Sequence, residues 1–189
     1  MRAICILGSP KANGNTAAIL NEAVAVLENS GVDTRLVRLG EAKIGFCVGC
    51  KTCEQTGKCV RNDDMNQIIR DIYEADIVIL ASPSYWGDVT AQMKQFIDRC
   101  TPYGNTNVNR APIPAGKLGA AIAVRAGQNK KENENLISTM EHFLGHLDIP
   151  LKFTLTVEGV DTREDLESRP AEFERARAFG REIAEYLIG

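Results

Sequence analysis

Short apolar runs alternate along the whole chain with longer segments whose apolar residues recur every three or four positions. Short runs that end at Gly, Ser or Pro are typical of buried parallel strands, and the longer periodic segments are typical of amphipathic helices. The predicted strands cover 3–7, 33–39, 76–81, 118–124 and 151–157. The predicted helices cover 15–29, about 65–72, about 89–100, about 136–147 and 171–187.

This alternation predicts βαβ units with right-handed crossovers and a single domain over 1–189. We expect an α/β fold of the flavodoxin-like, doubly wound type. It would be a three-layer sandwich around a five-stranded parallel sheet of order 2-1-3-4-5. Because 33–39 is half polar, that strand belongs at an edge. Ligands of such sheets bind outside the carboxyl ends of the strands, which here are the loops after strands one, three and four.

Composition narrows the class of protein. A content of 44% hydrophobic and 25% charged residues is ordinary for a soluble domain, and no apolar run reaches the ~20 residues of a membrane span. The N-terminus enters a strand directly, without the features of a secretory signal, so we expect a cytoplasmic protein. A net charge of −3 gives no basic surface for nucleic acid.

The first strand breaks at Gly8 into a loop of Ser, Asn, Gly and Thr that opens a helix. Backbone N–H groups and hydroxyls at a helix N-terminus can hold an anion. The loop has neither the Gly-Lys-Ser/Thr of a nucleoside-triphosphatase nor the Gly-x-Gly-x-x-Gly of a dinucleotide site. A single terminal phosphate is the best match, with hydroxyls on Ser9 and Thr16, the Asn15 amide and the charge of Lys11 around it.

Two further loops follow strand ends, at 82–88 and 125–128, and a long connection runs from 101 to 117. Connections of that length without their own secondary structure tend to be lids or interface arms. His142 and His146 are spaced for a metal, but no third ligand is evident, so we interpret them as surface residues.

Four of the six cysteines fall in an insertion loop at about 45–61, whereas Cys5 and Cys100 lie in segments whose periodicity predicts burial. Such clustering indicates metal or redox chemistry. Zinc sites usually combine two separated Cys-x-x-Cys pairs, and an evenly spaced arc suits an iron–sulfur cluster better. Empty or oxidised thiols are the third interpretation. The cysteines concerned are Cys47, Cys50, Cys53 and Cys59.

Three motifs follow one another in a fixed order: Gly8-Ser9-Pro10-Lys11-x-x-Gly14-Asn15-Thr16, Ser82-Pro83-x-Tyr85-Trp86 and Met93-Lys94-x-Phe96-Ile97-Asp98-Arg99. In this order they resemble the NADPH-dependent FMN reductase family of flavodoxin-like proteins. With Cys47-x-x-Cys50-x-x-Cys53 and Cys59 between the first two, the chain looks more narrowly like the iron–sulfur flavoproteins. Arg125-Ala126-Gly127 stands where relatives frequently have Gly-Gly.

The resemblance implies FMN as cofactor, a [4Fe-4S] cluster on the four cysteines, and NAD(P)H or a ferredoxin-like protein as electron donor. It also implies a homodimer or homotetramer, for which the 101–117 connection is a candidate contact. The phosphate would be surrounded by Ser9, Lys11, Asn13, Asn15 and Thr16, and the ring would be bordered by Pro83, Ser84, Tyr85, Trp86 and Gly87, with Arg125 and Gly127 nearby.

The function implied is an FMN-dependent oxidoreductase that passes electrons through flavin and cluster, with no catalytic side chain required. The alternatives are an NAD(P)H-dependent FMN or quinone reductase without a cluster, a non-catalytic flavodoxin-like carrier, and a zinc-bearing flavin-binding protein. Because the cysteine loop follows strand two, we expect cluster and flavin at the same carboxyl edge of the sheet.

Overall fold

Five parallel strands form one sheet in the order β2-β1-β3-β4-β5, in a computed structural model that describes residues 1–189. The strands are β1 (Arg2–Leu7), β2 (Asp33–Arg38), β3 (Ile77–Pro83), β4 (Leu118–Val124) and β5 (Leu151–Val157). The helices are α1 (Asn15–Asn29), α2 (Thr52–Thr56), α3 (Met65–Glu74), α4 (Ala91–Arg99), α5 (Lys130–His146), α6 (Arg163–Glu167) and α7 (Pro170–Ile188), with a 3-10 turn η1 (Thr101–Tyr103). The predicted flavodoxin-like sheet order is confirmed.

The position of each strand follows from its residues. β1, β3 and β4 are made almost entirely of Ile, Val, Leu, Ala and Cys and are buried on both faces, so they occupy the centre. β2 is exposed or half-buried at every residue except Val37, β5 alternates between buried and more exposed residues, and the two strands form the edges. The prediction that the second strand lies at an edge is therefore confirmed.

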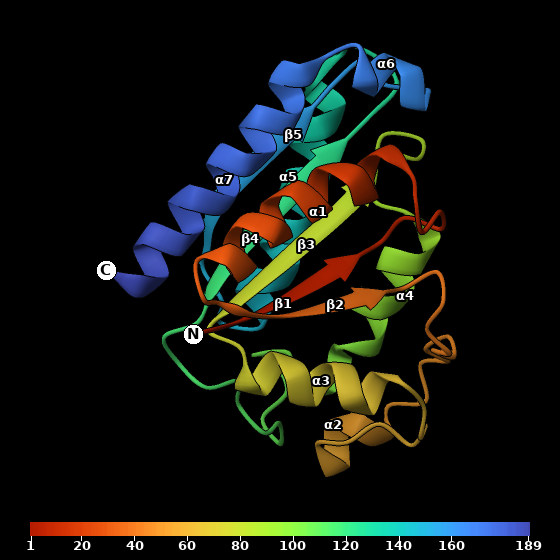
Figure 1. Cartoon of the computed structure of the whole chain (residues 1–189). Coiled ribbons are helices and arrows are strands. Elements are labelled where there is room, and N and C mark those ends of the chain that lie inside the picture. Colours follow the sequence, from red (N-terminus) through yellow and green to blue (C-terminus); the bar gives the residue numbers. More distant parts are fainter.

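Helices cover both faces of the sheet, as Figure 1 shows. One core cluster joins the sheet to α1 and α7, and the other joins it to α3, α4 and α5. Cys5 belongs to the first cluster and Cys100 to the second, which confirms that both are core residues. Burial raises the pKa of the Cys5 thiol to about 12.

β3 runs two residues further than the sequence predicts. Ser-Pro is a turn signal, but Ser82 and Pro83 still pair with Ala123 and Val124 of β4. The Ser84 N–H then donates to the Val124 carbonyl at 2.8 Å. Pairing with β4 thus extends β3 past the Ser-Pro turn signal, and the loop starts at Ser84.

Three short helical elements lie in segments for which the sequence predicts connections without secondary structure. α2 lies in the cysteine loop, η1 opens the 101–117 connection, and α6 lies in the charged connection after β5. α6 begins with a capping box, in which Thr162 and Asp165 bond each other's backbone N–H groups. None of the helices combines the length and apolar character that crossing a membrane requires.

Candidate functional site

A cavity of about 580 Å³ opens at the carboxyl ends of the strands. We call it the carboxyl-edge cavity. It is lined by Ser9, Lys11, Asn13, Gly14, Asn15, Thr16, Pro83, Ser84, Tyr85, Val124, Arg125, Ala126, Val160, Asp161, Thr162 and Arg163. The loops after β1, β3 and β4, which the sequence singles out, therefore meet around one space.

The β1 loop leaves the start of α1 open for an anion. Gly14 is the N-cap residue, no side chain caps the helix, and the first turn carries no acidic residue. The Ser9 hydroxyl accepts the Lys11 N–H at 3.1 Å, and Ser9 and Thr16 are both buried. Unsatisfied N–H groups and the positive end of the helix dipole thus face the cavity, as an anion site requires.

The Asn15 side chain, which also lines the cavity, is hydrogen-bonded to the loop between β5 and α6. Its amide donates to the carbonyls of Val160 at 3.1 Å and Thr162 at 2.8 Å, so both amide hydrogens are engaged within the chain. Asn15 therefore ties the β5–α6 loop to α1 and is not free to donate to a phosphate.

The β5–α6 loop forms a fourth wall of the cavity that sequence reasoning missed. It contributes Val160 to Arg163, and the Arg163 guanidinium donates to the Asn13 carbonyl at 3.2 Å. Two signals point to it: β5 ends at the same edge of the sheet, and Thr162-Arg163-Glu164-Asp165 resembles a capping box.

Thr90 fixes the β1 and β3 loops to each other. Its hydroxyl donates to the Gly8 carbonyl at 2.5 Å and accepts the Met93 N–H at 3.1 Å, which caps α4. Its own N–H donates to the Ser82 hydroxyl at 3.2 Å. Thr90 is fully buried, and because its bonds reach both Gly8 and Ser82 they fix the distance between the two loops.

Trp86, Gly87 and Gly127 do not line the cavity, although they were predicted site residues. Trp86 and Gly87 occupy a tight turn closed by Tyr85 and Asp88, with φ values of 57° and 77°. The Trp86 side chain is fully exposed and points away from other residues, while the Gly127 carbonyl accepts the Gly159 N–H at 2.9 Å.

Arg125 lines the cavity as predicted, but its guanidinium turns back toward α5. Nη2 pairs with Glu132 at 2.8 Å, and Nη1 donates to the Asn129 carbonyl. Its Nε–H is buried without a hydrogen-bond partner. The Arg125 guanidinium, with one N–H that has no acceptor, therefore lies in the part of the cavity wall that the loop after β4 forms.

The four clustered cysteines surround a second, smaller space of about 200 Å³, which we call the cysteine cavity. All four thiols border it, although no three of the side chains converge in the way that a single metal ion requires. Hydrogen bonds from Thr52 lower the pKa of Cys50, and burial together with the neighbouring thiols raises that of Cys53. Four sulfur donors around an open space are the donor set of an iron–sulfur cluster.

The 101–117 connection packs on the cysteine loop and holds α2. The Asn107 amide donates to the Cys53 carbonyl at 3.0 Å, and the Asn109 amide donates to the Glu54 carbonyl at 2.7 Å. Asn107 is itself buried. This part of the predicted interface arm therefore braces the cysteines within the same chain.

Arg99, the last residue of α4, anchors the other side of the loop. It pairs with Asp63 through two bonds, and its side chain is 1% exposed. Burial opposes the charge of Asp63, but bonds from Arg99 and from backbone N–H groups outweigh it and lower the pKa of the carboxyl group. Arg99 borders the cysteine cavity, and sequence reasoning did not assign it to the site.

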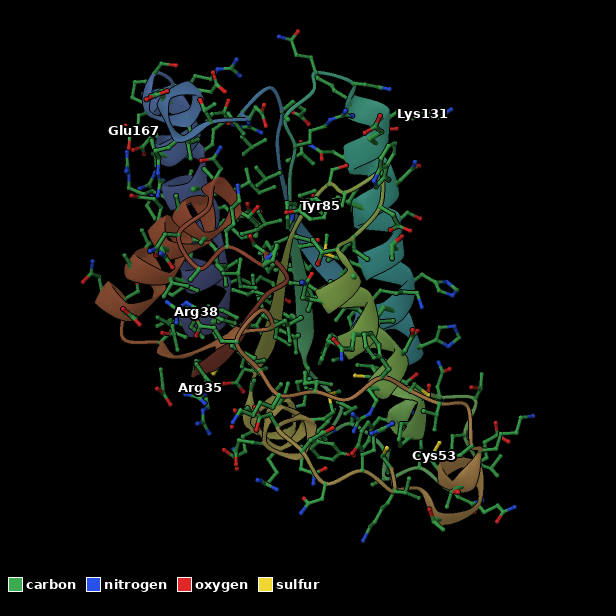
Figure 2. All side chains as sticks on the ribbon, turned by 90° about the vertical axis from the view of Figure 1, so that its right-hand side faces the viewer. Arg35, Arg38, Cys53, Tyr85, Lys131 and Glu167 are labelled. Carbon is green, nitrogen blue, oxygen red and sulfur yellow. The ribbon has the colours of Figure 1, made fainter.

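The two cavities lie at opposite ends of α4 and share no lining residue. Figure 2 shows Tyr85 near one end of α4 and Cys53 beyond the other. The sequence predicts cluster and flavin at one edge of the sheet, whereas the structure separates the cysteines from the carboxyl-edge cavity by the length of α4 (Figure 2). The loop begins at the carboxyl end of β2, but bonds from Gln95 to Ile44 and from Arg99 to Gly45 lead it along α4, whose nine residues span about 13.5 Å.

A third cavity, of about 580 Å³, lies between α4 and α5 and is bordered by His142 and His146. Their Nε2 atoms are 3.2 Å apart, and neither side chain is buried. No third ligand converges on them. His142 is exposed and His146 is half-buried, so both lie at the surface, as the sequence predicts.

Comparison with known proteins places the chain in a family. The NADPH-dependent FMN reductase family matches residues 1–155. An iron–sulfur flavoprotein of Archaeoglobus fulgidus is 48% identical over 132 residues, which are 70% of this chain and 58% of that protein. One of Methanocaldococcus jannaschii is 35% identical over 77% of this chain and 73% of its own length. The match thus spans little more than half of the Archaeoglobus relative.

Solved structures share the fold at low sequence identity. An NAD(P)H:quinone oxidoreductase from Methanothermobacter marburgensis superposes with a TM-score of 0.73 at 17% identity, over 97% of this chain and 96% of that one. An FMN-dependent NADH-azoreductase from Bacillus anthracis, solved with FMN, gives 0.72 at 9% identity over 97% and 100%. The chain belongs to the NADPH-dependent FMN reductase family, in its iron–sulfur flavoprotein branch.

Proposed function

We propose that this protein is an FMN-dependent oxidoreductase that passes electrons between a reduced donor and an acceptor through flavin and a [4Fe-4S] cluster. The donor would be NAD(P)H or a ferredoxin-like protein. The observation that carries the proposal is the carboxyl-edge cavity, in which an uncapped helix N-terminus faces the loops of β3 and β4. Family membership supports the same function.

The residues of the cavity suit the two ends of FMN. Backbone N–H groups at the start of α1, the buried hydroxyls of Ser9 and Thr16, and the Lys11 ammonium would hold the phosphate. Pro83, Ser84 and Tyr85 would border the ring, where an aromatic face and backbone groups can bind a flat heterocycle. Bound FMN supplies the hydride and electron chemistry, so this chain needs to bind and orient it and supplies no catalytic side chain.

Cys47, Cys50, Cys53 and Cys59 would hold the cluster. All four border one space of about 200 Å³, and three of them are evenly spaced on one short arc, which suits an iron–sulfur cluster better than the paired knuckles of a zinc site. Clustered cysteines that serve metal or redox chemistry are typical of a reducing compartment, and we propose the cytoplasm. A cluster there would supply one-electron transfer.

A reductase without a cluster is the second candidate function. The observation in its favour is that the carboxyl-edge cavity shares no lining residue with the cysteine cavity, so flavin could bind and react in the absence of iron. Metal content separates the two candidates.

The deciding experiment is anaerobic purification, with iron–sulfide reconstitution, followed by an absorbance spectrum and a count of iron, sulfide, zinc and flavin per chain. We expect about four irons and four sulfides beside one FMN, as the cluster formula requires. Stoichiometric zinc, or no metal after reconstitution, would contradict the cluster and favour the second candidate function, a reductase without a cluster.

Single Cys→Ala variants identify the ligands. Replacing any of Cys47, Cys50, Cys53 or Cys59 should remove most of the bound iron, because each supplies one of four ligands. Cys5→Ala is the matched control, since that thiol is buried in the core and should leave the iron count unchanged. Iron retained in all four loop variants would contradict the assignment.

We further propose a homodimer or homotetramer. Phe46 and Val48 of the cysteine loop and Val108 of the 101–117 connection that packs on it expose apolar surface that a second subunit would cover. Sedimentation velocity of the FMN-loaded protein tests this, and a monomer at micromolar concentration would contradict it.

A further inference from the structure

Arg99 is a buried cation beside the cysteine cavity. It ends α4, its side chain is 1% exposed, and it borders the same space as the four cysteines. Buried arginines are rare unless their charge and their N–H groups are matched by partners. The partners of Arg99 therefore indicate what it does.

Part of the guanidinium is matched within the chain. Nη1 donates to the Gly45 carbonyl at 2.7 Å and to Asp63 at 2.6 Å, and Nη2 donates to Asp63 at 3.1 Å. Asp63 in turn accepts the N–H groups of Gly45 at 3.0 Å and Met65 at 3.2 Å. These bonds hold the guanidinium rigidly at the start of the cysteine loop.

One donor is left over, because the Arg99 Nε–H is buried and has no partner in the chain. A buried donor without an acceptor loses its hydrogen bond to water and gains none in return, so native proteins contain few of them. An acceptor is therefore expected next to Arg99 on the side of the cysteine cavity, where Cys59 lies beside its guanidinium.

We propose that Arg99 tunes the iron–sulfur cluster: its Nε–H donates a hydrogen bond to a sulfur of the cluster site, and its charge favours the reduced state. This inference rests on the proposed cluster. Asp63 is the positioning residue that fixes the guanidinium. Hydrogen bonds to the sulfurs and local charge are among the factors that set cluster potentials.

The sign of the effect follows from charge. Four thiolates already make the site negative, and reduction adds one electron, so a nearby fixed cation raises the reduction potential. Asp63 partly offsets that cation. Removing the Arg99 charge should therefore lower the potential, and removing the Asp63 charge should raise it.

The test is a redox titration of the reconstituted protein, followed by absorbance and electron paramagnetic resonance, after iron and sulfide have been counted. Arg99→Gln should make cluster reduction at least tenfold less favourable, which is about 59 mV for one electron. Arg99→Lys keeps the charge and should give a smaller decrease. Asp63→Asn should shift the potential in the opposite direction.

Two controls separate tuning from general damage. Arg177→Gln removes the same charge on α7, where Arg177 pairs with Glu22 and Glu174, and should leave the cluster potential unchanged. The flavin potential from the same titration should also stay constant in Arg99→Gln, because Arg99 does not line the carboxyl-edge cavity.

Wild-type protein without iron would refute the proposed cluster itself. If the wild type holds a cluster, two results would overturn the role of Arg99 alone. The first is an equilibrium constant for cluster reduction that changes less than threefold in both Arg99→Gln and Arg99→Lys. The second is a shift of the potential in the same direction in Arg99→Gln and Asp63→Asn. If Arg99→Gln holds no iron, the other two variants decide the question. Potentials that shift in opposite directions in Arg99→Lys and Asp63→Asn support the role of Arg99, and shifts in the same direction overturn it.

Discussion

At the scale of single residues, Thr16 separates recognition of the phosphate from recognition of the ring. Thr16→Ala should weaken FMN about tenfold or more, since a charge-assisted hydrogen bond contributes about 1.5–3 kcal/mol, while riboflavin affinity stays within twofold. Titration of flavin fluorescence measures both affinities. Thr16→Ser keeps the hydroxyl and is the control, and equal losses for the two flavins would show that this loop does not hold the phosphate.

Asn15 illustrates how a residue of the right type can have another function. Its amide is committed to the Val160 and Thr162 carbonyls, so Asn15→Ala should weaken FMN and riboflavin alike by loosening the β5–α6 wall. The same titration therefore contrasts an indirect effect with the direct one at Thr16.

Trp86 adopts a backbone conformation that costs energy. With φ at 57° and a fully exposed side chain, it loses about 1–2 kcal/mol relative to a residue that tolerates the left-handed region, and it gains no burial. Trp86→Asn should raise the free energy of unfolding by about 1 kcal/mol in urea denaturation. Trp86→Phe keeps the strain and should change nothing, whereas a less stable Asn variant would mean that the indole packs after all.

At the scale of elements, Gly180 lets α7 pack closely on α1. A Cβ there would lie 2.7 Å from the Ala23 carbonyl oxygen, so Gly180→Ala forces the helices apart. Overpacking costs about 1–3 kcal/mol, against about 1 kcal/mol gained in helix propensity, and we expect a net loss of stability. Gly145→Ala in α5 meets open space and should stabilise the protein. Thermal unfolding of both variants checks the contrast, and a stabilised Gly180→Ala would refute the close packing.

The cysteine loop has one short helix, α2, as its only regular structure, and its shape comes from neighbours distant in sequence. Asp63 and Arg99 fix its beginning, while Asn107 and Asn109 hold α2. A short helix of five residues is marginal by itself, so these contacts account for its order.

At the scale of the whole molecule, the two cavities should behave independently in each chain. Cys59→Ala should leave FMN affinity within twofold of the wild type, and Thr16→Ala should leave the iron count unchanged, because the cavities share no lining residue. Flavin titration and iron analysis of the two variants measure this. A loss of FMN binding in Cys59→Ala would show that the cysteine loop shapes the flavin site.

The sequence by itself determined the strands, their order and the loops that carry the chemistry. The reason is that apolar runs and helical periods are local, and parallel strands with right-handed crossovers leave few topologies. The cysteines and the β1 loop were visible for the same reason, since their chemistry resides in adjacent residues.

Only the tertiary structure decided how these parts meet. It extended β3 along β4, turned the Asn15 amide to the β5–α6 loop, left Trp86 outside the cavity and placed Arg99 beside the cysteines. It also carried the cysteine loop to the far end of α4. Each outcome depends on hydrogen bonds or packing between residues far apart in the chain, which no local pattern encodes.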